Sequence, residues 1–281
     1  MALLVNELLK SPLKITSPHP LLPKSPNKTY IYVIYDFVVR IPFHFSKAQK
    51  LLHPSFKTIS HTHSSDFIMP LSLRPATVED ADQLTEIYFS AFQHDAISLL
   101  VFSRSSPHAR EWWHASILAE ITDPHAHFLC IVDLSSPTPE KIISYCKWNS
   151  PSAPIELDLP EWPQGADVEI ANHFFGNLVG RHERIMRGRK HWYLEFVATR
   201  PEEQGRGAAG MLLRWGMEKA DKEGAEAYLE ASPEGKPIYE HYGFREMERL
   251  VVSLEGKEDI VGIEKEFVEC FMVRHVTENK G

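Results

Sequence analysis

The chain has 281 residues, of which 43% are hydrophobic and 24% charged, and its 30 Lys and Arg against 38 Asp and Glu give a net charge of −8. This composition excludes a wholly disordered or collagen-like chain, and the length allows one or two domains. Three cysteines without a C-x-x-C pair argue against a disulfide scaffold and a cysteine zinc site, so we expect buried thiols in a reducing compartment.

Residues 1–68 differ chemically from the rest of the chain. They carry a net charge of +5, which leaves −13 for residues 69–281. Prolines interrupt regular elements, and no stretch has the ~20 clean apolar residues of a membrane span or the pattern of a secretory signal. We therefore expect a disordered, dispensable extension rich in Pro, Ser, Lys and His, one domain over 69–276 and a tail over 277–281. A mitochondrial presequence would be Arg-rich, whereas this segment has only Arg40, so we expect a cytoplasmic protein, with a nuclear location as the alternative.

The first predicted elements of the domain are a strand and two helical regions. Apolar residues alternate over 71–76, which predicts a short strand. Thr77 and Asp80 form the acidic variant of a capping box, which predicts a helix start that apolar residues at helical spacing continue. A second helical region is expected over 109–121.

A hairpin, a loop and a long helix follow. Strands are predicted over 128–132 and 141–148 with a Ser- and Pro-rich turn between them, then a Pro-rich acidic loop over 149–167. The helical period over 168–186 runs into a basic segment that ends at Lys190. We interpret that segment as a solvated helix end, with a phosphate contact as the alternative.

The remaining elements continue this alternation. They are a strand over 192–198, a helix over 207–222, a strand over 227–231, a helical turn over 238–242 and strands over 251–254 and 267–273. Strands and helices that alternate before a final antiparallel pair predict a mixed α/β sheet.

The charge of the domain limits its partners. An acidic body argues against a nucleic-acid partner, since such binding requires basic residues against phosphates, and it suits a cationic substrate. His125 and His127 form an H-x-H pair, as do His61 and His63, but no third ligand has suitable spacing, so we expect no metal site. We expect no membrane partner, and the sequence gives no indication of the oligomeric state.

The most informative segment is the glycine-containing stretch between the strand that ends near Ala198 and the next helix. Gly205 and Gly207 allow a ligand close to the backbone, and the free N–H groups of the following helix start favour an anion such as a pyrophosphate. Arg206 can add positive charge. A generic phosphate-binding or structural glycine turn is the alternative interpretation.

The same glycines also fit a nicotinamide dinucleotide fingerprint. Gly205, Gly207 and Gly210 spell G-x-G-x-x-G, and Glu230 lies at the distance where an acid would contact the ribose. In that fingerprint, however, the first glycine follows the strand almost directly, whereas here Arg-Pro-Glu-Glu-Gln intervenes. We therefore do not favour a dinucleotide site.

Two motifs carry a family resemblance. The segment Glu202 to Gly207 resembles motif A of the GCN5-related N-acetyltransferases (GNAT), Q/R-x-x-G-x-G/A, apart from Glu202 in the first position. Downstream, Tyr239 to Phe244 resembles the Y-x-x-x-G-F ending of motif B at the expected distance. The resemblance covers about residues 71–275 and implies the GNAT fold, an α/β fold whose mixed central sheet has splayed strands and is flanked by helices.

The resemblance also implies acetyl-CoA as co-substrate and no metal. By similarity, the pantetheine amides would bind the backbone where the motif A strand splays from its neighbour, and the pyrophosphate would meet the glycine loop. The residues implied for this coenzyme site are Val197, Ala198, Thr199, Gln204, Gly205, Arg206, Gly207, Ala208 and Ala209. A backbone N–H near Val197 would polarise the thioester carbonyl.

Two side chains are implied as catalytic. Tyr239 matches the tyrosine that the family commonly uses as general acid toward the coenzyme A thiolate; a packed aromatic is the alternative. Glu195 lies where related arylalkylamine acetyltransferases carry a histidine near the amine, so it is our candidate general base, with His191 or a water chain to another carboxylate as alternatives.

The function that we expect is therefore acetyl transfer from acetyl-CoA to a primary amine of a small molecule by direct attack in a ternary complex. A protein or peptide amine is the alternative substrate, and a non-catalytic acyl-coenzyme A-binding module is the alternative class. The amine itself is not encoded in any motif that we can identify.

Overall fold

The computed structural model describes residues 70–153, 158–262 and 265–276. Its helices and strands are, in chain order, β1 (Leu71–Pro75), η1 (Val78–Asp80), α1 (Ala81–Ala91), α2 (Ala96–Val101), α3 (Pro107–Glu120), β2 (Ala126–Asp133), β3 (Ile142–Asn149), α4 (Val168–Met186), β4 (His191–Thr199), η2 (Pro201–Glu203), α5 (Ala208–Glu223), β5 (Glu226–Ala231), α6 (Lys236–His241), β6 (Arg245–Ser253), α7 (Glu258–Val261) and β7 (Glu266–Arg274). The predicted extension 1–68 and tail 277–281 lie outside the described residues, so the domain boundaries stay predictions.

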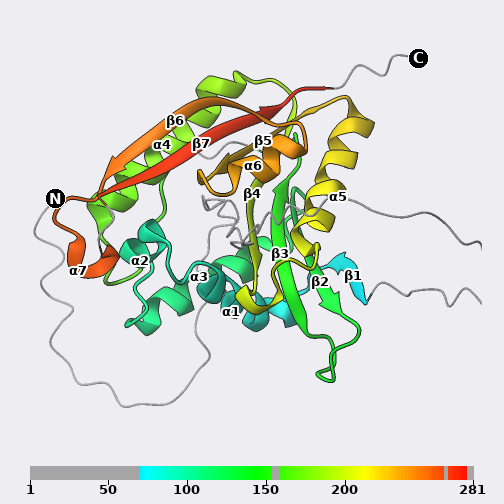
Figure 1. Ribbon diagram of the computed structural model, residues 1–281, viewed down its shortest axis with the longest axis horizontal. Coiled ribbons are helices and arrows are strands. Elements are labelled where there is room, and N and C mark those ends of the chain that lie inside the picture. The colour runs from blue at the N-terminus through cyan, green and yellow to red at the C-terminus, as the bar shows by residue number, and fades with distance from the viewer. Residues whose placement is uncertain (1–69, 154–157, 263–264, 277–281) are drawn as a thin grey trace, which may run out of the picture.

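The strands form one seven-stranded sheet in the order β1-β2-β3-β4-β5-β7-β6 (Figure 1). Neighbouring strands are antiparallel except β4 and β5, which run parallel. The helix α5 supplies the crossover that a parallel pair requires. The mixed α/β sheet flanked by helices that we predicted from the sequence is thus confirmed.

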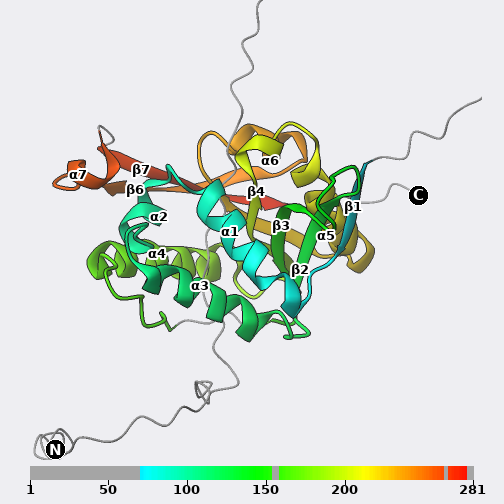
Figure 2. The ribbon, with the colours of Figure 1, turned by 90° about the horizontal axis from the view of Figure 1, so that it is seen from below.

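Helices cover both faces of the sheet (Figures 1 and 2). Two successive residues of β3 show this, because neighbouring side chains of a strand point to opposite faces. Lys147 contacts Glu120 of α3 on one face. Trp148 packs on α5 on the other, so tightly that a Cβ atom added at Gly216 would lie 2.1 Å from its ring. The close approach of α5 to β3 thus requires glycine at position 216.

The face with α1 and α3 has an aromatic core. Tyr88 of α1 stacks on Trp113 of α3 with ring centroids 3.5 Å apart, and Trp113 also meets Phe196 of β4 edge-on at 6.0 Å. Burial of such rings contributes strongly to the stability of a core. These contacts place α3 beside the middle of β4, and the tryptophan pair of α3 belongs largely to the core.

The sequence predicted most elements close to their observed bounds, including the full extent of α4. The capping box is also present, with the Thr77 N–H donating to Asp80 Oδ2 at 2.8 Å. Two short helices, α2 and α7, were missed, and β6 begins six residues earlier than expected. The α2 helix begins after Asp95, whose carboxylate accepts from the Ser98 N–H at 2.6 Å. An acid before an apolar run was the available signal for that helix.

The basic segment at the end of α4 is paired with acids of the sheet. Arg181 and Arg184 both contact Glu248 of β6, and Arg189 Nε lies 2.9 Å from Glu226 Oε2 of β5. Three of the five basic residues of the segment therefore join this end of α4 to the sheet, while Lys190 contacts Glu223 of α5 and Arg187 donates to the Arg184 carbonyl.

The three cysteines are free thiols, all buried, as we expected from the sequence. Among the described residues, no helix combines the length and the apolar character needed to cross a bilayer.

Candidate active site

The sheet opens between β4 and β5. The two strands pair from His191 with Glu226 to Leu194 with Leu229, and in the described part of the chain they have no paired residues beyond. On its other edge β4 stays paired with β3 as far as Thr199. Half of β4 therefore has a partner on one side only, and we call the space beyond Leu194 and Leu229 the strand opening.

Backbone groups of β4 face this opening. The Arg200 N–H donates to the Ile143 carbonyl of β3 at 2.9 Å, and the Ala198 carbonyl accepts from Ser144 of β3 at 2.9 Å. Residues whose backbone groups point to the same side recur every second position along a strand. This alternation directs the N–H groups of Val197 and Thr199 away from β3 and toward the opening.

Glu195 occupies a β-bulge at the start of the opening. In the pairing of β3 with β4, Lys147 pairs with Phe196 but the next residue, Trp148, pairs with Leu194, so Glu195 is the extra residue. A bulge turns a side chain that would otherwise face the opposite side of the sheet. The Glu195 carboxylate consequently lies on the α3 face, where it is buried and accepts from the Asn149 amide.

A buried lysine joins Glu195 to a second carboxylate. Lys147 Nζ lies 2.8 Å from Glu195 Oε2 and also contacts Glu120 of α3, and all three side chains are at least 95% buried. Burial lowers the pKa of Lys147, but the charges of Glu120 and Glu195 outweigh burial and raise it above its ordinary value. We call Glu120, Lys147 and Glu195 the charge triad.

The pKa of the Glu195 carboxyl is close to neutral pH. Burial raises its pKa to about 7, although the ammonium of Lys147 acts in the opposite direction, and the second carboxylate, Glu120, adds to the rise. A carboxyl of this kind takes up a proton at neutral pH far more readily than an exposed one. The predicted base thus has an environment that suits proton uptake.

Glu230 lies fully buried on β5, which forms the other side of the opening. Tyr228 donates to Glu230 Oε1 at 2.7 Å, and in the described part of the chain Oε2 has no hydrogen-bond partner. Burial raises the pKa of Glu230 to about 8, against the effect of the Tyr228 hydrogen bond. A carboxyl in the ribose position of a dinucleotide site would instead have to accept hydrogen bonds from its ligand in solvent-accessible space, so this burial disfavours that interpretation.

The glycine loop leads from β4 into α5. Gly205 and Gly207 have φ values of 77° and 83°, where other residues are strained, and an added Cβ atom would meet nothing within 4 Å at either position. Gly207 is the N-cap of α5 and has no side chain to cap the N–H groups of Ala208 and Ala209. The loop therefore offers free N–H groups in open space, as an anion site requires.

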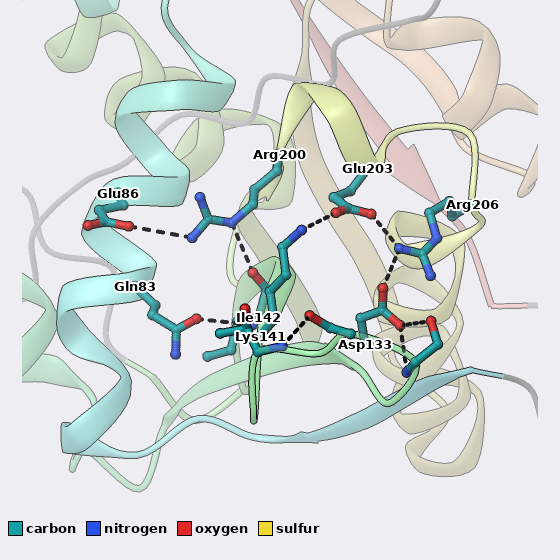
Figure 3. A network of polar contacts seen from close by, with 11 residues as sticks. Gln83, Glu86, Asp133, Lys141, Ile142, Arg200, Glu203 and Arg206 are labelled. Atoms are coloured by element: carbon teal, nitrogen blue, oxygen red, sulfur yellow. Dashed lines mark hydrogen bonds and ion pairs between the residues drawn. The ribbon is translucent and has the colours of Figure 1, made fainter.

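The side chain of Arg206 is already paired (Figure 3). Its Nη1 lies 2.7 Å from Asp133 Oδ2 and also contacts Glu203, which in turn contacts Lys141. Arg200, at the other end of the loop, donates to the Ile142 carbonyl at 3.0 Å. These contacts fasten the loop to the ends of β2 and β3, and they leave anion binding at this position to the backbone.

The α6 helix places Tyr239 in the interior. Tyr239 is fully buried, meets Phe244 edge-on at 6.1 Å, and its carbonyl accepts from the Phe244 N–H at 3.0 Å. The same helix reaches the start of α5, where a Cβ atom at Gly210 would lie 2.7 Å from the Tyr242 hydroxyl. The two motifs of the sequence thus meet at the N-terminal turn of α5.

The alternative base, His191, lies at the closed end of β4. It precedes Glu195 by four residues, a distance of about 13 Å along a strand. Its Nδ1 lies 2.6 Å from the Arg189 carbonyl and its Nε2 lies 2.7 Å from Nε2 of His182. Because a carbonyl only accepts, Nδ1 of His191 carries the proton and His182 donates to Nε2. His191 is therefore engaged in the paired part of the sheet.

The described H-x-H pair, His125 and His127, has structural neighbours. His127 packs against Trp192 and Trp215, and His125 lies 3.3 Å from the Ser150 hydroxyl; the pair at 61 and 63 lies outside the described residues. Among described residues, no group of three or more His, Cys, Asp or Glu side chains could hold a metal ion.

Lys147 and Glu120 were not predicted from the sequence as site residues. A signal existed for Lys147, because it is the only charged residue in the otherwise apolar and neutral strand 142–149. A charge inside a buried strand requires a partner. Nothing local marked Glu120 at the end of a helix as that partner.

Comparisons with known proteins agree with this architecture. Residues 83–244 match the model of the acetyltransferase (GNAT) family. An uncharacterized N-acetyltransferase of Schizosaccharomyces pombe is 34% identical over 67 residues, which cover 24% of this chain and 27% of that protein. The chain thus spans about a quarter of the length of that relative.

Solved structures extend the likeness to the fold. A histone acetyltransferase HPA2 and related acetyltransferase from Corynebacterium glutamicum is 17% identical with a TM-score of 0.50, over 75% of this chain and 99% of that one. The PaiA N-acetyltransferase of Thermoplasma acidophilum, solved in complex with coenzyme A, is 14% identical with a TM-score of 0.42, over 73% of this chain and 98% of that one.

Proposed function

We propose that this chain, which belongs to the GNAT family of acetyltransferases, is an acetyl-CoA-dependent acyltransferase whose acceptor is a primary amine of a small molecule. The amine would attack the acetyl group directly while both substrates are bound. The observation that carries this proposal is the position of Glu195, a buried carboxyl with a raised pKa at the bulge where β4 leaves β5.

The described residues fit the coenzyme. Acetyl-CoA supplies the activated acetyl thioester when it is bound. The N–H groups of Val197 and Thr199 face the opening and can bind amide carbonyls, and Gly207, Ala208 and Ala209 present N–H groups to a pyrophosphate. The Val197 N–H can also stabilise negative charge that develops on the acyl oxygen. This recognition uses the backbone, so the paired side chain of Arg206 is not needed for it.

Glu195 would remove a proton from the acceptor amine. An ammonium has no free electron pair, so it must lose a proton before it can attack. With a pKa near 7, Glu195 is partly ionised at neutral pH and can accept that proton, directly or through water. Tyr239 would donate a proton to the departing thiolate, in line with its place on α6 beside the start of α5.

A small acceptor suits the charges of the domain. Glu195, which is partly ionised at neutral pH, lies at the opening, and the chain from residue 69 onward carries −13. These charges favour a cationic acceptor. A peptide amine is the alternative acceptor, and binding without turnover would indicate a non-catalytic module. The free thiols support a reducing compartment, and we propose the cytoplasm.

Thiol release from acetyl-CoA tests the proposal. The full chain is assayed with a panel of small primary amines and with peptides that carry free N-terminal and lysine amines. We expect turnover with a small amine at a higher kcat/KM than with any peptide. Turnover confined to peptides would contradict the acceptor class, and coenzyme binding without turnover on either panel would contradict catalysis.

Variants of the two proposed catalytic residues complete the test. We expect Glu195→Gln to lower kcat by ~10²–10⁴-fold, the usual range for loss of a general base. Tyr239→Phe should lower kcat while the affinity for coenzyme A stays the same. Glu248→Gln, the same change at a surface ion pair of β6, is the control and should leave turnover unchanged. Full activity in either catalytic variant would remove that residue from the mechanism.

A further inference from the structure

The charge triad has one ammonium for two carboxylates. Lys147 Nζ lies 3.0 Å and 2.8 Å from the two oxygens of Glu195, and it contacts Glu120 at the same time. The ammonium also lies 5.9 Å from the centre of the Phe128 ring. The three residues come from α3, β3 and β4, so the triad joins a helix to the bulge through the sheet.

The net charge of the triad determines which protonation state is favoured. With all three groups ionised, a buried site would carry a net charge of −1, which is costly in a medium of low polarity. One proton on a carboxyl makes the triad neutral. Among the described residues, Glu195 also interacts electrostatically with the carboxyl of Glu230 on β5 and with the hydroxyl of Tyr193 on β4 itself, and neither group supplies a positive charge. The triad therefore favours the uptake of one proton.

We propose that Glu120 is a positioning residue that keeps Glu195 able to accept the proton of the acceptor amine, by sharing the ammonium of Lys147. With Glu120 present, the ammonium is already neutralised, so Glu195 is not fixed as a permanent ion pair. The inference rests on the proposed role of Glu195 as the general base. It assigns Lys147 and Glu120, whose side chains are 0% and 5% exposed, to the control of that base.

The proton balance follows directly. The N–H bond of the acceptor ammonium breaks and an O–H bond forms on Glu195, so the triad changes from −1 to neutral. The amine keeps its electron pair for attack on the acetyl group. After the attack the nitrogen loses a second proton as the C–S bond breaks, and this proton, passed through water, replaces the one that Tyr239 gives to the departing thiolate. Glu195 returns its own proton to water after the product leaves, and Lys147 and Glu120 remain a neutral pair throughout.

Removal of Glu120 and removal of Lys147 should shift the pKa of Glu195 in opposite directions. Without the carboxylate of Glu120, the ammonium belongs to Glu195 alone, and an adjacent cation lowers the pKa of a carboxyl by about 1–3 pH units. Without Lys147, two carboxyls share a buried site with no cation, and the titration of Glu195 should move to higher pH. A purely structural role for the triad predicts loss of stability but no such pair of opposite shifts.

The test measures the ionisation of Glu195 in the full chain. The protein is labelled with ¹³C at the glutamate side-chain carboxyls and titrated by NMR, and the signal absent from Glu195→Gln identifies Glu195. We expect a midpoint near neutral pH in the wild type, a midpoint lower by one pH unit or more in Glu120→Gln, and a higher one in Lys147→Met. Glu248→Gln is the control and should not move it.

If Lys147→Met does not fold, Glu120→Gln alone tests the inference. Its amide has the same size as the carboxylate that it replaces. An unchanged Glu195 midpoint in Glu120→Gln overturns the inference. The acid limb of the pH–rate profile, measured with acetyl-CoA and the best amine of the panel, should move with the NMR midpoint. If the NMR midpoints shift while Glu195→Gln keeps its acid limb, the role of Glu195 as base fails although the electrostatic coupling stands.

Discussion

The glycine loop and the charge triad lie at opposite ends of the half of β4 that is not paired with β5. The charged side chains of these two regions differ in their access to water. At the loop, Arg206 forms ion pairs with Glu203 and with Asp133 of β2; the arginine side chain is 30% exposed, and the two carboxylate side chains are 10% and 8% exposed. In the charge triad, every side chain is at least 95% buried. Water therefore reaches the cation of the first group and is excluded from the cation of the second.

This difference determines what the charges do. An ion pair whose cation is partly exposed contributes little free energy, so the pairs of the loop mainly hold its backbone in place for a ligand. Buried charges interact strongly and shift one another's protonation. The loop can therefore bind an anion through N–H groups alone, while the triad can control where a proton resides.

The sharpest test of the comparison is removal of the buried cation. Lys147→Met removes the cation that two buried carboxyls share, and we expect it to lower the free energy of unfolding by ~3–5 kcal/mol. Urea denaturation measures this change. Lys141→Met, which removes a partly exposed lysine that contacts Glu203 in the loop, is the matched control and should change stability little. Equal losses in the two variants would contradict the comparison.

The next effect concerns the pH dependence of stability through Glu230. Its pKa is about 8 in the folded protein against 4.5 for an ordinary glutamate, so between these values the unfolded chain has released a proton that the folded protein retains. Stability is therefore full below about pH 4.5 and falls as pH rises toward 8.

Glu230→Gln should remove this part of the pH dependence. We expect the variant to gain a few kcal/mol relative to the wild type at pH 8 and nothing near pH 4, as measured by urea denaturation at each pH. The amide oxygen can still accept from Tyr228. A difference between variant and wild type that stays constant with pH would show that Glu230 ionises normally in the fold.

A smaller effect is expected at the N-cap of α5. Gly207→Ala places a side chain at a φ of 83°, which costs ~1–2 kcal/mol, and puts a Cβ atom where the coenzyme would approach. Gly224→Ala, at the other end of the same helix with a φ of 58°, is the control. We expect similar losses of stability, but weaker binding of coenzyme A by calorimetry only in Gly207→Ala. Equal affinities would contradict a coenzyme site at the loop.

The smallest effect is expected at the loop ion pairs. Arg206→Ala should change Tm by no more than ~1–3 °C, because the arginine side chain is 30% exposed and water screens its charge. The KM for acetyl-CoA should change only a few-fold if the backbone binds the pyrophosphate. A loss of coenzyme binding far beyond this would show that the side chain leaves Asp133 to bind phosphate, and the comparison would have to be revised.

Local patterns predicted the fold well. The period of apolar residues gave α4 its full extent, and the alternation of strands and helices gave the mixed sheet. Short elements such as α2 and α7 were missed because a helix of one or two turns shows too little periodicity. The early start of β6 was missed because four of its first five residues are charged and none of the five is buried.

The candidate site also has features that local sequence patterns predict and features that depend on strand pairing. The glycine loop was recognisable because its function depends on backbone angles at Gly205 and Gly207, which neighbouring residues specify. Glu195 was identified through a family resemblance, but its bulge was not, since a bulge appears only in the pairing with β3.

The sequence by itself determined the order of elements, the positive φ angles of the loop and the free N–H groups at the start of α5, because each depends on residues a few positions apart. Only the tertiary structure decided the chemistry of Glu195. Lys147 lies 48 positions and Glu120 lies 75 positions before it, and the three meet only when α3 packs on the sheet. The pKa of a buried group depends on such neighbours and on the exclusion of water, and neither is encoded in a local pattern.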